Sequence, residues 1–325
     1  MLLLMSPALP AAAAPVPLVD QPLTGDVAPG TWTTGGGPSS TSTGACLTAA
    51  TAATTDFAAC ATVDPAGTGA LRITEMAHGQ AAFALYNVPI PTANGLRIEF
   101  DMYQYSGEDG GADGSTFVLV DGTANPTAAG YLGLGLGYLA LDDPGLAGAY
   151  SAVGFDWYGA FSDAYNGTGP GFQPNSVVVR GSEASNYAFV ATDPADGLLA
   201  APIETSRTNA LRHVVITVTS TGLLSASVDY GAGLVPELTS VDLTTVSGAL
   251  PATVKVGFTG GTGGLGMVQE FNNLVVDPLA VPAPAAPAAL AATGVEPGWT
   301  LFAALAVLVG VGVLVWRRRV GDSLR

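Results

Sequence analysis

One aspartate stands in a setting that suits ligand binding. Asp113 lies between Ala112 and Gly114, directly before a strand-like run. A carboxylate can accept hydrogen bonds from two hydroxyl groups at once, and bonds to a charged acceptor are stronger than neutral ones. An aspartate between small residues is also typical of a turn in any β protein. Taken alone, the residue types favour the turn, so a binding role for Asp113 needs support from the rest of the chain.

Catalytic chemistry has less support. Glu99 and Asp101 begin the pattern E-x-D-x-x-E that is used by sandwich-fold glucanases of the laminarinase type, but Gln104 occupies the third position. A retaining mechanism needs two carboxyl groups about 5 Å apart, and an amide can neither donate the proton nor attack. His78 and His213 stand in no setting typical of Ser–His–Asp catalysis. We therefore predict that the chain is not an enzyme.

The elements that would position such side chains are short strands. Clusters of Gly, Asp, Asn and Pro separate them and mark turns. The strand-like runs are 71–74, 95–103, 115–120, 152–158, 176–179, 213–219, 224–230, 253–258 and 273–276. No stretch in this region has the sustained apolar period of a helix. So many short strands predict an all-β fold, an antiparallel two-sheet β-sandwich.

Composition argues against one class of partner. The 325 residues include 10 Lys and Arg against 26 Asp and Glu, which gives a formal net charge of −16. Because a surface this acidic repels polyphosphate, we predict no nucleic-acid partner. With both ends set aside as processing segments, roughly 250 residues remain for folding, which is enough for one large domain.

The N-terminal residues 1–15 resemble a secretory signal peptide. An apolar stretch leads into a run of alanines, as in the apolar region and small-residue cleavage site of such a signal. The usual positively charged start is missing, so the signal is shortened or begins upstream, and a disordered Ala/Pro tail is the alternative. We favour the signal because the other end of the chain independently requires export.

The C-terminal residues 290–325 carry the most specific pattern in the chain. A motif of the L-A-x-T-G type consists of Leu290, Ala291, Ala292, Thr293 and Gly294. An apolar run over 299–316 follows, close to the minimum length of a transmembrane helix, and then three arginines at 317–319. This order resembles a Gram-positive sortase signal, which implies cleavage after Thr293 and covalent transfer to the cell wall. A plain membrane anchor is the alternative, and both place the bulk of the chain outside the cell.

The segment 279–289, just before this motif, is rich in Pro and Ala. Regularly spaced prolines favour an extended, semi-rigid chain. We predict a stalk that holds the folded part away from its anchor.

Cys46 and Cys60 are the only cysteines of the chain. An exported protein with two thiols most often pairs them. The resulting loop would contribute about 3 kcal/mol of stability by the loop-entropy model. Both cysteines lie in the weakly patterned segment 22–69, which we therefore predict to be a loop-rich lead-in stapled by a disulfide.

Four segments, in order along the chain, carry a resemblance to a known family. They are 96–122, 130–134, 152–163 and 254–274. The first contains the element A-D-G-x-x-F, from Ala112 to Phe117. Together they resemble a bacterial member of the legume-type (L-type) lectin family. The resemblance implies a concanavalin-like jelly roll over 70–278, with a glycan as its ligand.

The same resemblance implies three sugar-contacting residues. In the family, the aspartate of the A-D-G element follows a cis peptide bond and accepts hydrogen bonds from sugar hydroxyls, and Asp113 matches it. Gly130 lies where the family has a glycine loop whose backbone N–H meets the sugar. Tyr158 matches an aromatic residue whose ring stacks on an apolar face of the sugar.

A metal loop is also implied, with departures. Asp156, Tyr158 (through its backbone carbonyl) and Asp163 fall at the family's calcium-ligand spacings, but Ala160 replaces an asparagine. Gly154 stands where the family's transition-metal site needs a glutamate, so we expect no transition metal. Calcium takes roughly six to eight oxygen ligands. Two interpretations stay open: a calcium site that lacks one ligand, or ordinary loop carboxylates.

We therefore expect a lectin-like protein that is extracellular, anchored to the cell wall or membrane, and acts in adhesion or glycan recognition. Its partners would be a glycan, sortase and the cell wall, and the membrane through its C-terminal helix. The alternative is a structural surface protein that keeps the lectin fold without binding sugar. Ala160 and Gly154 favour the alternative, whereas Asp113 in its A-D-G element favours the lectin.

Overall fold

The fold is that of a computed structural model, which describes residues 16–61, 63–165, 167–193 and 206–279. The signal peptide expected over 1–15 lies outside the described residues. So do the sorting motif, membrane helix and basic tail expected over 290–325, and all of the expected stalk except Leu279. Within the described residues, no helix is long and apolar enough to cross a membrane.

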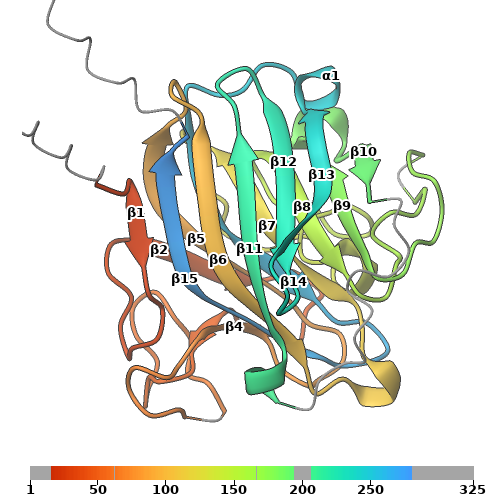
Figure 1. The fold of residues 1–325 in the computed structure, drawn as a ribbon. Helices are drawn as coiled ribbons and strands as arrows, with labels where there is room; N and C mark the ends of the chain where they lie inside the picture. Colours follow the sequence, from red (N-terminus) through yellow and green to blue (C-terminus); the bar gives the residue numbers. More distant parts are fainter. Residues whose placement is uncertain (1–15, 62, 166, 194–205, 280–325) are drawn as a thin grey trace, which may run out of the picture. The chain divides into compact units, whose positions relative to one another are not determined.

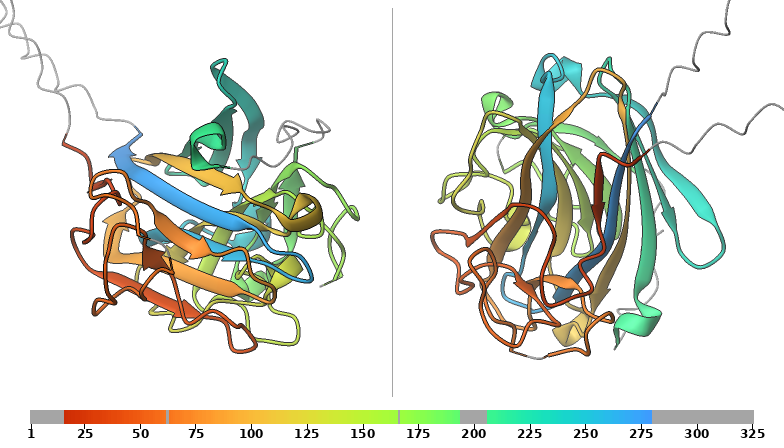
Figure 2. Two further views of the ribbon diagram at one scale, coloured as in Figure 1. Left: turned by 90° about the horizontal axis from the view of Figure 1, so that it is seen from below. Right: turned by 90° about the vertical axis from the view of Figure 1, so that its left-hand side faces the viewer.

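Two antiparallel sheets pack face to face (Figures 1 and 2). The first sheet has eight strands. In spatial order they are β13 (Leu234–Asp242), β12 (Leu223–Asp229), β11 (Leu211–Val218), β6 (Leu96–Tyr105), β15 (Val268–Pro278), β4 (Leu71–Thr74) and β3 (Cys46–Leu47), with β1 (Val19–Gln21) paired to β15. Burial along β6 and β12 alternates, because one face of this sheet packs on the core and the other faces solvent.

The second sheet has seven strands. In spatial order they are β10 (Phe189–Thr192), β9 (Ser176–Arg180), β8 (Ala149–Asp156), β7 (Gly114–Asp121), β14 (Thr253–Gly261), β5 (Ala81–Pro91) and β2 (Trp32–Gly36). Every residue of β8 and of β9 is buried, so both faces of this sheet are covered. Such strands read as continuous apolar runs without alternation.

Besides the strands, the described residues form a few short helical segments. They are η1 (Glu108–Gly110), η2 (Gly133–Gly135), η3 (Glu183–Ser185), η4 (Arg207–Asn209) and the α-helix α1 (Thr244–Ser247). None of these segments forms a layer of its own, so the described part of the chain is the all-β two-sheet sandwich that the sequence predicts.

Five phenylalanines form the centre of the core between the sheets. Phe100 and Phe271 come from the first sheet, and Phe117, Phe155 and Phe258 from the second. The rings of Phe258 and Phe271 stack with centroids 4.0 Å apart, and those of Phe100 and Phe117 with centroids 5.5 Å apart. All five are essentially fully buried. Aromatic residues dominate core energetics because each removes a large apolar area from water.

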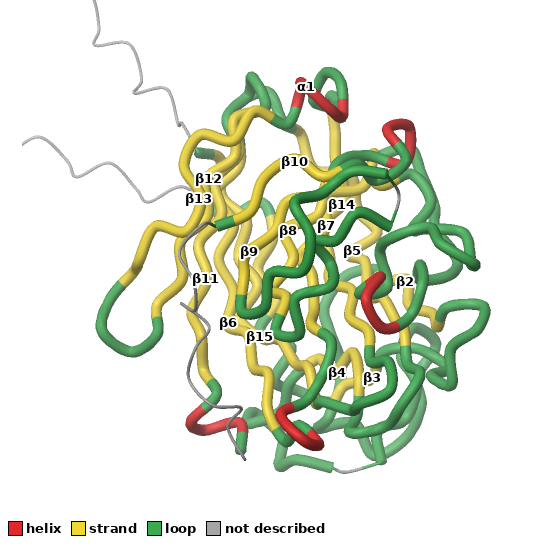
Figure 3. The backbone as a smooth tube through the Cα atoms, turned by 90° about the vertical axis from the view of Figure 1, so that its right-hand side faces the viewer, coloured by secondary structure: helices red, strands yellow, loops and turns green. Residues whose placement is uncertain are grey.

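A second apolar cluster lies on the outer face of the second sheet. Phe83 of β5, Val118 of β7 and Val178 of β9 pack there against the loop residues Tyr138 and Phe161. Figure 3 shows loops crossing in front of β7, β8 and β9 on this side. These loops are therefore anchored by buried side chains, and they carry the residues of the candidate site.

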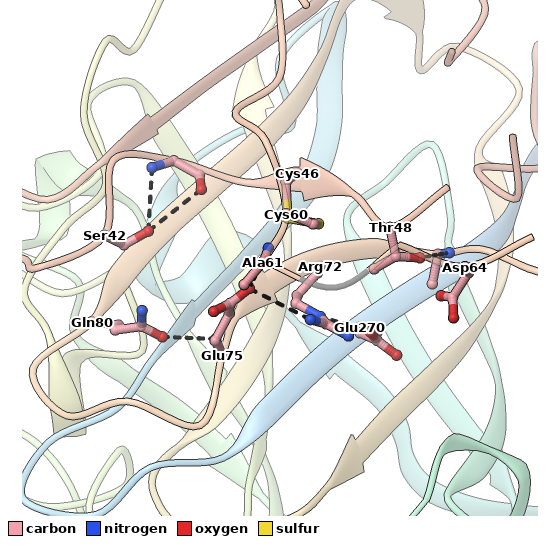
Figure 4. Close-up of a disulfide and its surroundings, with 12 residues drawn as sticks. Ser42, Cys46, Thr48, Cys60, Ala61, Asp64, Arg72, Glu75, Gln80 and Glu270 are labelled. Atoms are coloured by element: carbon pink, nitrogen blue, oxygen red, sulfur yellow. Dashed lines mark hydrogen bonds and ion pairs between the residues drawn. A yellow bond between two sulfur atoms is a disulfide. The ribbon is translucent and has the colours of Figure 1, made fainter. Parts of the chain in front are cut away.

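The expected lead-in is part of the sandwich, since β3 is a strand of the first sheet and β2 is a strand of the second. Cys46 and Cys60 form the predicted disulfide, with Cα atoms 5.4 Å apart (Figure 4). Beside it, Arg72 on β4 donates from Nε to Oε1 of Glu270 on β15 at 2.8 Å. Glu270 is completely buried, and Arg207 also pairs with its carboxylate. This network ties the lead-in side of the first sheet together.

Candidate functional site

A pocket of about 290 Å³ opens over one end of the second sheet. Segments that are far apart in the sequence form it: the residues before β7, the turn at η2, the loop between β8 and β9, and the β14–β15 turn. Its lining residues are Ala112, Asp113, Tyr131, Leu132, Gly133, Leu134, Tyr158, Ala160, Tyr165, Gly263, Gly264 and Leu265. A concave, mainly apolar surface with few polar groups is the usual form of a small-ligand site.

Asp113 is held in place by its backbone. The Ala112–Asp113 peptide bond is cis, as the family resemblance implies. The N–H of Asp113 donates to the carbonyl oxygen of Gly261 at 3.1 Å, and its own carbonyl accepts from the N–H of Tyr158 at 2.9 Å. The residue is only 5% exposed. Its side chain therefore has a fixed direction.

The carboxylate of Asp113 lacks a hydrogen-bond partner on one oxygen. Oδ2 is buried and unpaired within the described residues. Two glycines lie beside it: a Cβ on Gly263 would lie 3.0 Å from this oxygen, and a Cβ on Gly133 would lie 3.4 Å away. Burial raises the pKa of Asp113 to about 7, while the backbone N–H of Gly263 acts to lower it. An unpaired buried acceptor is costly, so a ligand hydroxyl at this point gains a strong partner.

Tyrosines form the wall of the pocket. Tyr158 is 44% exposed, and its ring meets that of Phe172 edge-on, with centroids 5.3 Å apart. Tyr165 is 55% exposed, and Tyr131 is half-buried. Exposed aromatic rings beside a buried acceptor offer both an apolar surface and a hydrogen-bonding anchor.

A neighbouring hollow of about 550 Å³ extends the pocket. The two share Tyr131, Leu134 and Tyr165, and the second continues to Asp142 and Asn186. The shared residues make the two hollows contiguous. A ligand that enters beside Asp113 can therefore extend over Tyr165 toward polar side chains.

Gly130 does not line the pocket. It is buried, and its N–H donates to the carbonyl oxygen of Gly137 at 2.7 Å. Gly133, three residues along, faces Asp113 together with Gly263. Sequence reasoning did not single out Gly133, Gly263 or Tyr165, and among so many glycines only their position beside Asp113 distinguishes the first two.

The three residues expected to bind metal lie at the end of β8 and in the loop after it. Asp156 is completely buried, and its Oδ1 and Oδ2 accept hydrogen bonds from the N–H groups of Gly159 and Phe161, both at 2.7 Å. Oδ1 of Asp163 accepts from the N–H of Ala164 at 2.7 Å. Tyr158, the third, lines the pocket. Burial raises the pKa of Asp156 to about 7, against the lowering effect of the two N–H donors.

This donor set does not fit calcium, which needs roughly six to eight oxygen ligands. Both oxygens of Asp156 are engaged by loop N–H groups, and Ala160 supplies no side-chain oxygen. The described residues contain no group of three or more His, Cys, Asp or Glu side chains that could hold a metal ion. At the transition-metal position, a Cβ on Gly154 would lie 2.6 Å from the ring of Phe161, so a glutamate has no room there.

The carboxylates considered for catalysis lie elsewhere. Asp101 and Glu99 on β6 face His213 on β11, with His213 Nδ1 2.8 Å from Asp101 Oδ1. Gln104 instead donates from Nε2 to the carbonyl oxygen of Phe155 at 3.0 Å. None of these residues lines the pocket that holds Asp113.

No family model and no curated protein matches the sequence. Among solved structures, the chain is similar to lectin I-B4 of Griffonia simplicifolia in its metal-free form, with 19% identity over 64% of this chain and 87% of that one and a TM-score of 0.45. Lectin II of Ulex europaeus is 23% identical over 65% of this chain and 87% of that one, with a TM-score of 0.47. The exoplasmic/lumenal domain of VIP36, in a form bound to Ca²⁺ and Man3GlcNAc, is 13% identical over 79% and 89%, with a TM-score of 0.46.

Proposed function

We propose that this chain is a carbohydrate-binding protein whose ligand enters the pocket at Asp113. The observation that carries the proposal is the buried, unpaired Oδ2 of Asp113, a residue that lines the pocket, with Gly133 and Gly263 as its small neighbours. A sugar hydroxyl placed there donates to the carboxylate, and charge-assisted bonds of this kind are among the stronger ones. The proposed recognition transfers no proton and forms no covalent bond, so it is reversible binding.

The tyrosine wall supplies the second half of the recognition. A sugar ring has hydroxyl groups at its edge and an apolar C–H face, and it needs both kinds of surface. Tyr158 and Tyr165 present half-exposed rings beside Asp113. An aromatic ring offers apolar contact area at low conformational-entropy cost. The contiguous hollow toward Asp142 and Asn186 gives room for a ligand of more than one sugar ring.

Calcium is not required in this proposal. The side chains of Asp156 and Asp163 bond the loop's own backbone, and Asp113 needs no metal to be oriented, since Gly261 and Tyr158 fix its backbone.

The proposed location is the cell surface. The exported chain is first held in the membrane, and sortase then joins Thr293 to the cell wall. Support comes from the order of motif, apolar run and arginines at the C-terminus and from the signal-like N-terminus. Single lectin sites usually bind weakly, and many copies on one wall would bind a glycan-coated surface by avidity. Adhesion follows from that arrangement. Mass spectrometry of wall digests should find a peptide ending at Thr293, and an intact C-terminus in the membrane fraction would reject sorting.

The binding proposal is tested with a glycan array followed by calorimetry on the hits. We expect Asp113→Asn to abolish binding, because the amide keeps the size of the side chain but loses its charge. Asp26→Asn is the matched control, since Asp26 is an exposed aspartate outside the pocket. Absence of any hit with the wild type, or hits unchanged in Asp113→Asn, would favour the second candidate, a structural surface protein with this fold. The missing amide at Ala160 is the observation that favours that candidate.

A further inference from the structure

A buried cation that belongs to the protein itself lies under the loop 157–175. Arg180, the last residue of β9, is completely buried. Its Nε donates to the carbonyl oxygen of Phe161 at 2.8 Å, and its Nη2 donates to that of Asp163 at 2.6 Å. Its Nη1 donates to the carbonyl oxygen of Thr168 at 3.1 Å. One guanidinium group therefore joins three carbonyls from different parts of the loop.

The surroundings of this guanidinium explain a departure from the family pattern. The Cζ atom of Arg180 lies 5.7 Å from the ring centroid of Phe161 and 5.7 Å from that of Phe189. Rings at this distance attract a cation. The Phe161 ring also occupies the space that a side chain at Gly154 would need, because a Cβ there would lie 2.6 Å from it. Gly154, Phe161 and Arg180 thus form one packing unit.

The charge of Arg180 is retained in this setting. Burial lowers its pKa to about 10, and the nearby carboxylate of Asp156 acts to raise it. The group is therefore protonated at neutral pH. A buried charge is tolerated only when it is paired and hydrogen-bonded, and here the loop carbonyls supply the acceptors.

We propose that Arg180 organises this loop, in which the resemblance places a calcium site. A divalent ion would gather oxygens of the loop around itself, whereas here the planar guanidinium gathers the carbonyls of Phe161, Asp163 and Thr168. Arg180 is a positioning residue, because it acts through the loop that carries Tyr158, Ala160 and Tyr165 into the pocket. The effect of Arg180 on the pocket is the only part of this proposal that rests on the proposed glycan-binding function.

The geometry also predicts that lysine cannot replace arginine at position 180. Lysine carries its charge on one compact ammonium group, while the guanidinium presents five N–H donors in a rigid plane. The three carbonyls of the loop are bonded by Nε, Nη1 and Nη2, so each nitrogen of the plane is used. Arg180→Lys keeps the charge and loses this arrangement, which makes it the informative conservative variant.

Hydrogen–deuterium exchange of the loop amides in the full-length chain tests the proposal without any glycan. We expect wild-type exchange over 157–175 to be unchanged by EDTA and by millimolar calcium. In Arg180→Ala and Arg180→Lys, exchange should be roughly tenfold faster or more, because several charge-assisted bonds are lost. Millimolar methylguanidinium should restore protection in Arg180→Ala and leave Arg180→Lys unchanged. Arg212→Ala is the control, since the Arg212 side chain donates to the carbonyl oxygen of its neighbour Leu211 and stacks on Tyr230.

Two results would overturn the proposal. Faster loop exchange of the wild type in EDTA, reversed by calcium, would show that a metal ion organises the loop. Wild-type protection in Arg180→Lys would show that charge alone is enough and that the arrangement of the donors is irrelevant. If Arg180→Ala does not fold, the exchange of the wild type in EDTA and the exchange of Arg180→Lys still test the proposal. If the protein binds no glycan but exchange of its loop is unchanged by EDTA, the proposed function is rejected and the role of Arg180 is retained.

Discussion

The N–H of Tyr158 donates a 2.9 Å hydrogen bond to the carbonyl oxygen of Asp113. The bond joins the residue before β7 to the loop after β8, next to the pairing of Gly114 with Asp156 in the sheet. It fixes the acidic group and the aromatic wall of the pocket relative to each other through the backbone alone. Side-chain substitutions in the pocket should therefore change ligand binding more than they change the fold.

Gly263→Ala is expected to block the pocket. The added Cβ would lie 3.0 Å from Oδ2 of Asp113, in the space where a ligand hydroxyl must sit. Gly263 does not adopt a left-handed backbone conformation, so alanine adds no backbone strain. Losing the bond to a charged acceptor should weaken glycan binding roughly tenfold or more in calorimetry, with little change in Tm. Gly25→Ala is the control, because its Cβ would make only an ordinary 3.5 Å contact with Val27. Equal affinities for the two variants would mean that the glycan does not use Oδ2.

Glycan affinity should rise with pH through the neutral range. Burial raises the pKa of Asp113 to about 7. The ionised carboxylate accepts hydroxyl hydrogen bonds and the protonated one accepts them poorly, so binding favours the form present above that pKa. We expect affinity at about pH 5.5 to be roughly tenfold or more below that at about pH 8.5, measured by calorimetry in matched buffers. A flat profile would place the sugar's hydroxyl groups elsewhere in the pocket.

The parts of the fold that were predictable from sequence are the strands with clear patterns. Alternation in β6 and the apolar runs of β7, β8 and β9 identify them, because burial on one or both faces leaves a period in the residues. β5 was missed because it is rich in Ala and ends in Pro, and both residues are rare in strands. β13 contains Pro236 and was also missed. It lies at the edge of the first sheet, where a proline is tolerated.

The candidate site was predictable only where one residue type carries the chemistry. Asp113 stands out only through its A-D-G element and the other segments of the resemblance, because an aspartate between small residues is by itself typical of a turn. Tyr165 and Gly263 reach the pocket from loops whose course depends on tertiary packing, and no local pattern specifies it. Arg180 reads as the end of a strand, and its loop carbonyl partners become visible only in three dimensions.

The stability of the protein should fall as pH rises toward about 8 because of Glu237. Oε1 of Glu237 accepts from the hydroxyl of Tyr230 at 2.8 Å, and burial together with Asp193 raises the pKa of Glu237 to about 8. A carboxyl whose pKa is higher in the folded state than the 4.5 that is usual for a glutamate contributes stability below that usual pKa and loses it as pH rises to the folded pKa. Asp113 and Asp156 act with the same sign, so the comparison needs a variant. Thermal unfolding of Glu237→Gln should lose less Tm between about pH 5 and pH 9 than the wild type. Parallel curves would show that Glu237 titrates normally.

Removing the disulfide should cost stability and spare binding. Cys46 and Cys60 are separated by 14 positions, and cross-linking a loop of that size restricts the unfolded chain. The loop-entropy model gives a loss of about 3 kcal/mol in the free energy of unfolding for the double variant Cys46→Ser with Cys60→Ser, measured by urea titration. Reducing agent should produce the same loss in the wild type and no further loss in the variant, which isolates the bond from the substitution. Neither cysteine lines the pocket, so glycan affinity of the folded variant should be unchanged. A weakened affinity at a temperature where the variant is fully folded would mean that the lead-in, through β2 and β3, helps to hold the pocket in shape.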